Sequence, residues 1–293
     1  MFKKYKKEIA ASLSILSNGF LITLKLIAGI LSGSISIISE AIHSTLDFLA
    51  SAITFFAIMR SKKPADKEHP FGHGRYEDVS GFIEGILIIC ASFFIMIEAC
   101  KKIADINSFE LNSTPAIIIM ILSVVINYIV SKILYNIGKK ADSVALKADA
   151  KHLSSDIYSS LGVLFGLVLI KITGYIIIDS IIAIFIALFI LKTGYYVSKE
   201  AFNNLVDGTL PDEDINAITK ILNETDGING YINLKSRKSG PNRDIDITIL
   251  CNENMTLKAC HQICDDIEEK IMQSLPNTLI TIHCEPDNKQ TFM

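Results

Sequence analysis

Four ionisable residues with the spacing of metal ligands lie inside two long apolar stretches. His43 and Asp47 are four residues apart in EAIHSTLD, and His152 and Asp156 have the same spacing in ADAKHLSSD. On a helix, residues four apart lie on one face. Ionisable residues inside a membrane helix are costly, and by default they indicate a functional site. Two His and two Asp suit a four-coordinate site for a zinc-like ion.

A simpler explanation is that each His and Asp satisfies a polar contact between packed helices. For one histidine alone this explanation is preferred, but two matched pairs in two apolar stretches favour a metal site. Glu40 and Asp149 extend the match, since each is an acid three residues before the histidine of its pair. Imidazole and carboxylate suit Zn²⁺ and also Co²⁺, Fe²⁺, Mn²⁺ or Ni²⁺, whereas Ca²⁺ takes oxygen ligands.

The elements that carry these pairs are predicted to be membrane helices. The 293 residues are 50% hydrophobic and 20% charged, which predicts an apolar part and a separate polar part. The net charge of -3 gives no reason to expect a nucleic-acid partner. A bilayer span needs about 20 apolar residues, and six stretches of that kind occupy residues 9–31, 35–59, 79–99, 115–135, 145–170 and 175–197. The first stretch is interpreted as a span and not as a cleaved signal peptide.

Lys and Arg are unevenly distributed among the loops between these stretches. They are frequent in the N-terminal segment and in the loops after the second and fourth stretches, and sparse in the other loops. Positively charged loops face the cytoplasm, so both termini are predicted to be cytoplasmic, in a membrane that we expect to be a bacterial plasma membrane. We expect a transmembrane transport domain with six spans over residues 1–208 and a cytoplasmic domain over residues 209–293.

The polar C-terminal part is predicted to be a small α+β domain. Helical spacing over residues 212–224 is followed by a strand at 227–236 and by an alternating strand at 244–250. Thr256 is a candidate cap for a helix reaching about residue 273, and residues 278–284 are predicted to form the last strand. The order α-β-β-α-β suits a two-layer fold. The predicted fold is thus an all-α six-helix transmembrane domain followed by a small cytoplasmic α+β domain.

Several motifs of the chain resemble the cation diffusion facilitator family of divalent-metal transporters. HSTLD and ADAKHLSSD carry the resemblance, together with HPFGHGRYE at residues 69–77 and LVDGTLP at residues 205–211. The resemblance implies a metallochaperone-like cytoplasmic domain, a homodimer, and efflux of divalent metal from the cytoplasm driven by inward protons. Metal binding needs neutral His, which gives proton exchange a physical route. An intact His-Asp pair on each helix resembles the zinc-preferring members, and cobalt, iron and cadmium stay open.

The resemblance also indicates two further metal sites. Asp66, His69 and His73 in the loop DKEHPFGH resemble a weaker site, although a solvated loop explains these residues equally well. In the polar part, three residues match positions that hold regulatory metal in the family, namely His261, His283 and Glu285. Ile232 and Thr248 stand where two more histidines would be expected, so we predict at most one well-bound ion there.

The cysteines near these positions allow two interpretations. Cys260, Cys264 and Cys284 are candidates to replace the missing histidines as thiolate ligands. Buried, idle cysteines in a reducing cytoplasm are at least as good an explanation.

Two other functional classes fit the sequence less well than transport does. An intramembrane metallohydrolase would need a motif such as H-E-x-x-H, which the sequence lacks around His43 and His152. Four protein ligands would also leave no position for a catalytic water. A membrane metal sensor would leave the His-Asp pairs of the apolar stretches unexplained. We therefore predict a transporter and not an enzyme, with a divalent cation and protons as the transported species and the lipid bilayer as its environment.

Overall fold

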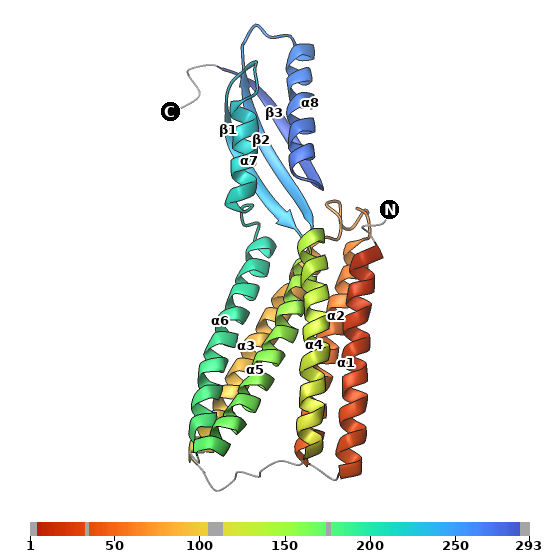
Figure 1. Ribbon diagram of the computed structural model, residues 1–293. Coiled ribbons are helices and arrows are strands. Elements are labelled where there is room, and N and C mark those ends of the chain that lie inside the picture. Colours follow the sequence, from red (N-terminus) through yellow and green to blue (C-terminus); the bar gives the residue numbers. More distant parts are fainter. Residues whose placement is uncertain (1–4, 33–34, 105–113, 174–176, 288–293) are drawn as a thin grey trace. The chain divides into compact units, whose positions relative to one another are not determined.

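The computed structural model describes residues 5–32, 35–104, 114–173 and 177–287. Some side chains within these ranges, including those of His43 and Glu40, lie outside the description. The chain forms two compact units, Met1–Phe202 and Asn203–Met293. Figure 1 shows long helices in the first unit and a sheet with helices in the second.

The first unit consists, in its described residues, of long helices. They are α1 Tyr5–Ser32, α2 Ile35–Ser61, α3 Arg75–Ala104, α4 Thr114–Ala141, α5 Val144–Thr173 and α6 Ile177–Leu205. Within the described residues, four segments are long and apolar enough to cross a membrane, at 6–27, 75–101, 121–141 and 180–205. The prediction of a helical transmembrane domain is confirmed. The predicted count of six spans stays a prediction, because α2 and α5 are not among these four.

Helix α5 packs against α2, α3 and α4 and so brings these three helices together. Small and aliphatic side chains of α1, α2, α4 and α5 form one buried apolar cluster, in which Leu146 and Leu153 of α5 are fully buried. Helices α3 and α6 approach closely at Gly85, where a Cβ atom would lie 2.6 Å from the backbone nitrogen of Ser198. Only glycine therefore fits at this crossing.

The second unit is a three-stranded sheet with two helices. Its elements are α7 Asp212–Asn223, β1 Ile228–Ser239, β2 Asn242–Cys251, α8 Leu257–Ser274 and β3 Thr278–Pro286. The strand order is β1-β2-β3, with β1 and β2 antiparallel and β2 and β3 parallel. A parallel pair needs a crossover connection, and α8 supplies it. The predicted α-β-β-α-β order is confirmed, and all three strands are longer than predicted.

The apolar core of this unit lies between the helices and one face of the sheet. Ile245, Ile247 and Ile249 of β2 are buried there, together with Ile267 and Ile271 of α8. Strand alternation places the three isoleucines on one face, as their spacing predicted. Thr256 caps α8, because its hydroxyl accepts a hydrogen bond from the backbone N–H of Ala259 at 3.3 Å.

Candidate metal sites

Three metal-ligand side chains of the first unit lie together between α2 and α5. One ligand atom each of Asp47, His152 and Asp156 lies within 4.8 Å of the other two, and we refer to these residues as the α2–α5 group. The Nε2 atom of His152 is 3.3 Å from Oδ1 of Asp47. His152 and Asp47 are buried, whereas Asp156 is half-buried. The group offers one imidazole and two carboxylates, which is a ligand set for a borderline divalent cation.

Local helix geometry explains why two of these side chains, those of His152 and Asp156, lie together. His152 and Asp156 are one turn apart on α5, so their side chains extend from the same face. Asp47 comes from α2, which packs against α5. His43, the fourth predicted ligand, lies one turn before Asp47 on α2, but its side chain lies outside the described residues. The described residues therefore contain three of the four predicted members of this site.

Two fully buried acids, Glu84 and Asp149, lie near His152 in addition to the predicted ligands. Oε2 of Glu84, from α3, is 3.7 Å from Nδ1 of His152, and Oε1 of Glu84 accepts a hydrogen bond from Thr54 at 3.0 Å. Asp149 accepts a hydrogen bond from Ser51 at 3.3 Å. Both acids are 0% exposed. The only sequence signal for Glu84 is an ionisable residue inside the apolar stretch 79–99, and a single acid does not reveal which residue it lies beside.

Several polar atoms around His152 retain unused hydrogen-bonding capacity. Within the described residues, Nδ1 of His152, Oε2 of Glu84 and Oδ2 of Asp149 are buried without a hydrogen-bond partner. Buried polar groups are normally satisfied, and exceptions call for a specific explanation. A bound cation or exchangeable protons would supply the missing partners, so this polar centre has the chemistry of an ion-binding site inside a membrane domain.

The loop between α2 and α3 also brings its predicted ligands together. Asp66, His69 and His73 each place a ligand atom within 4.8 Å of the other two. Nε2 of His73 is 3.4 Å from Oδ2 of Asp66, and the two imidazole rings are 4.4 Å apart between centroids. The backbone N–H of His69 donates to Asp66 at 2.7 Å and holds the pKa of that carboxyl below its usual range. An ionised acid beside two imidazoles is suited to bind a cation.

The three ligands predicted in the second unit do not form one group. Nε2 of His283 is 3.4 Å from Oε1 of Glu285 on β3. His261 lies on the exposed face of α8 and is 3.9 Å from Asp265. Among the residues that the structure describes, neither His261, His283 nor Glu285 belongs to a set of three potential ligands within 4.8 Å. Helix α8 does pack against β3, but it presents Cys260 and Cys264 to the core instead of His261.

Comparisons with known proteins match both units. Residues 11–206 match the family described as the cation efflux transmembrane domain, and residues 210–287 match the cation efflux protein cytoplasmic domain. The chain is 32% identical over 265 residues to the transporter sll1263 of Synechocystis, covering 90% of this chain and 85% of that protein. It is 28% identical over 267 residues to the cation-efflux pump FieF of Citrobacter koseri, covering 91% of this chain and 88% of the pump.

A solved structure of CzrB is similar to part of the chain, with 27% identity, coverage of 27% of this chain and 99% of that one, and a TM-score of 0.26. The two matched domains together extend over most of the sequence. The first of them and the membrane-length helices identify an integral membrane protein. The chain therefore belongs to the cation efflux family, also called the cation diffusion facilitator family, whose members are cation efflux transporters.

Proposed function

We propose that this protein exports a divalent transition-metal cation, with Zn²⁺ as the first candidate, from the cytoplasm in exchange for protons. The observation that carries the proposal is the α2–α5 group, in which Asp47, His152 and Asp156 lie within 4.8 Å of one another inside the membrane unit. With His43 as a fourth ligand the site would be four-coordinate, as Zn²⁺ prefers. Fe²⁺, Mn²⁺, Co²⁺ and Cd²⁺ are the alternatives for the same site and the same mechanism.

Exchange for protons is supported by the surroundings of His152. A histidine binds metal in its neutral form. When the ion leaves, a proton on His152 would be stabilised by Asp47 at 3.3 Å and by Glu84 at 3.7 Å. The same side chains would thus bind either the cation or a proton, and the two species would compete for the site. Such competition is the physical basis of antiport.

Alternating access is supported by the origin of the ligands. Asp47 comes from α2, and His152 and Asp156 come from α5. A site shared between two helices can be opened toward either side when the helices rock against each other. Ligands confined to one helix would move with it and would not change their exposure in this way.

The other parts of the proposal rest on the C-terminal unit and on the loops. The unit matches a cytoplasmic domain, which supports the predicted cytoplasmic C-terminus, and we propose that it forms a homodimer. The Lys and Arg distribution supports a cytoplasmic N-terminus, and relatives such as FieF support a bacterial plasma membrane. We propose transport without an enzymatic reaction.

Zinc flux in proteoliposomes that contain only the purified protein tests the proposal. We expect Zn²⁺ to enter faster when the vesicle interior is acidic, and the interior to become more alkaline as Zn²⁺ enters. Asp47→Ala and Asp156→Ala should reduce the flux to that of protein-free vesicles. Tyr158→Phe is the matched control, because Tyr158 lies on the same helix with an exposed side chain, and it should transport normally.

Three results would contradict parts of this proposal. Flux that ignores a proton gradient at fixed metal concentration would indicate a uniporter. Metal binding without any flux would favour a membrane sensor. If Fe²⁺, Mn²⁺, Co²⁺ or Cd²⁺ were transported faster than Zn²⁺ in competition, that ion would be the preferred cargo in place of zinc. The proposed transport site would stay the same.

A further inference from the structure

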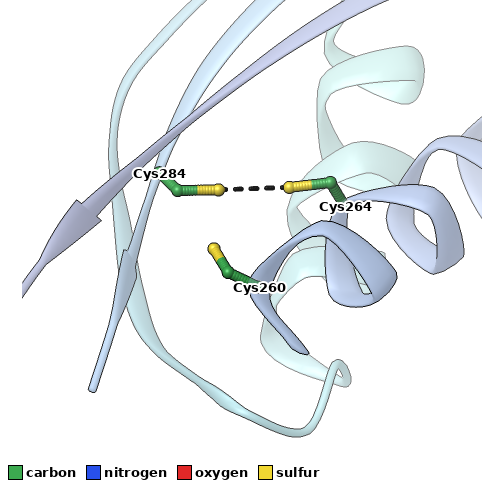
Figure 2. Close-up of side chains that lie close together, drawn as sticks. All are labelled: Cys260, Cys264 and Cys284. Carbon is green, nitrogen blue, oxygen red and sulfur yellow. Dashed lines mark hydrogen bonds between the residues drawn. The ribbon is translucent and has the colours of Figure 1, made fainter. Parts of the chain in front are cut away.

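The core of the C-terminal unit contains a group of three thiols. The Sγ atoms of Cys260, Cys264 and Cys284 lie within 4.8 Å of one another, and we refer to these residues as the thiol group. In Figure 2, Cys264 and Cys284 point toward each other, and the sulfur of Cys260 points toward the space beside them. The Sγ atoms of Cys264 and Cys284 are 3.2 Å apart. The described cysteines are all free thiols.

Two elements place these thiols. Cys260 and Cys264 are one turn apart on α8 and begin the buried stripe that continues through Ile267 and Ile271. Cys284 lies on β3, where residues 279, 281 and 283 are exposed and the alternate residues turn inward. Helix α8 packs against β3, so its first turns face the end of the strand. The three sulfurs therefore converge because a helix face meets a strand face.

A fourth thiol adjoins this group. Cys251, at the end of β2, has its Sγ atom 3.5 Å from that of Cys260. Four of the six cysteines of the chain thus gather in one small core, whose other buried members are mostly Ile and Leu. Cysteine can serve as a small apolar side chain, but packing alone does not require that thiols contact thiols. Zn–S bonds of about 2.3 Å hold two sulfurs of a tetrahedral site about 3.8 Å apart, which resembles the spacings found here.

We propose that Cys260, Cys264 and Cys284 bind one thiophilic d¹⁰ cation of the Zn²⁺ and Cd²⁺ class, with Cys251 positioned as a fourth ligand. Thiolates select such soft or borderline ions. This site differs from the one indicated by His283 and Glu285, because neighbouring residues of a strand point to opposite faces. His283 is exposed on one face of β3, whereas Cys284 turns toward the core. The proposal does not depend on which cation the membrane unit transports.

Binding requires the thiols to lose their protons. Burial raises the pKa of Cys264 and of Cys284, so both are protonated at neutral pH when no metal is bound. One divalent cation and three thiols would form a trithiolate complex with one net negative charge and release three protons. A fourth thiolate from Cys251 would release one more proton. Because the ligands come from α8 and β3, the ion would tie the helix to an edge strand of the sheet.

Cadmium titration of the full-length protein tests this proposal. The protein is purified in detergent, stripped of metal with a chelator, and kept reduced with a phosphine that has no thiol of its own. Cd²⁺ bound to thiolates produces ultraviolet charge-transfer absorption, which carboxylate and imidazole ligands do not. We expect this absorption to saturate at one equivalent per chain and to disappear when excess Zn²⁺ is added. This measurement on the unmutated protein requires no variant to fold.

Variants then assign the absorption to residues. Cys264→Ala and Cys284→Ser should each weaken Cd²⁺ binding at least tenfold. The double variant Cys90→Ala/Cys100→Ala should bind as before, since those two cysteines are exposed on α3 of the other unit. Three results would overturn the proposal. The first two are the absence of charge-transfer absorption in the reduced protein and a Cd²⁺ affinity that is unchanged by loss of Cys264. A Cys264–Cys284 disulfide in the oxidised protein, with no Cd²⁺ uptake after reduction, would overturn it as well.

Discussion

The α2–α5 group and the thiol group have a common plan. In each, two candidate ligands lie one turn apart on a single helix, and a third comes from a neighbouring element. His152 and Asp156 are joined by Asp47, whereas Cys260 and Cys264 are joined by Cys284. The helix itself fixes the relative positions of two candidate ligands. Only one packing contact with another element is then needed to complete a set of three.

The two groups differ in their donor atoms and in their surroundings. The α2–α5 group offers nitrogen and oxygen, with Glu84 and Asp149 close by, and such ligands can exchange a cation for protons. The thiol group offers sulfur inside an apolar core, where a bound soft ion would be held firmly. The same arrangement of side chains could therefore bind a transported cation in one unit and a permanently bound cation in the other. The following experiments probe that difference.

The largest effect is expected from removing one ligand of each group in turn. Asp156→Ala should reduce Zn²⁺ flux in proteoliposomes to background but leave the Cd²⁺–thiolate absorption intact, because Asp156 belongs only to the α2–α5 group. Cys264→Ala should weaken the Cd²⁺ binding that produces this absorption at least tenfold, and it should leave Asp47, His152 and Asp156 undisturbed. If Asp156→Ala also removed the absorption, the two groups would not be independent sites.

A large loss of stability is expected from Ile267→Ala, which opens a cavity beside the thiol group. Ile267 is 0% exposed in the core of the C-terminal unit, and such truncations cost about 2–5 kcal/mol. Hydrogen exchange of the C-terminal unit in the full-length protein should accelerate accordingly. Leu257→Ala is the control, since Leu257 is 86% exposed on the same helix, and its effect should stay within about 0.5 kcal/mol. Equal effects of the two variants would contradict the core described here.

A smaller effect is expected at Glu84, which lies beside the α2–α5 group without belonging to it. Glu84→Gln keeps the shape of the side chain and its contact with Thr54 but removes an ionisable carboxyl group 3.7 Å from His152. We expect Zn²⁺ flux to persist, but fewer protons should leave the vesicle for each Zn²⁺ ion that enters. The measurement is a reduced alkalinisation of the vesicle interior. Glu98→Gln makes the same change at an exposed position of α3 and should not alter the coupling.

The smallest effect is expected from the pH dependence of the metal-free thiols. Burial raises the pKa of Cys251 to about 11, above the value of about 8.5 for a free cysteine. The folded state then retains a proton that the unfolded state releases, so the stabilisation is complete below about pH 8.5 and is lost as the pH rises toward 11. The urea concentration at which half of the C-terminal unit is unfolded should fall between about pH 8.5 and pH 11. Brief proteolysis of the unfolded fraction measures this midpoint. Cys251→Ala should flatten the decline, whereas a midpoint that rises with pH would contradict it.

The sequence determined the elements of this protein well, because their signals are local. Long apolar stretches predicted the membrane helices, and the alternation of Ile245, Ile247 and Ile249 predicted the face of β2 that is buried. Thr256 was predicted to cap α8 and does so. Caps, strand alternation and helix spacing depend on residues a few positions apart, so a single sequence contains them in full.

The sequence also determined which ligands share a helix, since a separation of four residues fixes a common face. It placed His152 and Asp156 together in this way, and the same rule applies to Cys260 and Cys264. It did not determine which side of α8 would be buried against β3. His261 and Cys260 are adjacent in the chain, yet one is exposed and the other lies in the core. The expected meeting of His261 with His283 and Glu285 is therefore absent from the described part of the chain.

Only the tertiary structure decided the third member of each group. Asp47 lies 3.3 Å from His152 although 105 positions separate them, and Cys264 contacts Cys284 from 20 positions away. Glu84 approaches His152 from yet another helix. Such distances depend on how helices and strands pack, and packing is set by the complementary shapes of many apolar side chains at once. The sequence by itself determined the donors and their local spacing, and the fold decided which of them meet.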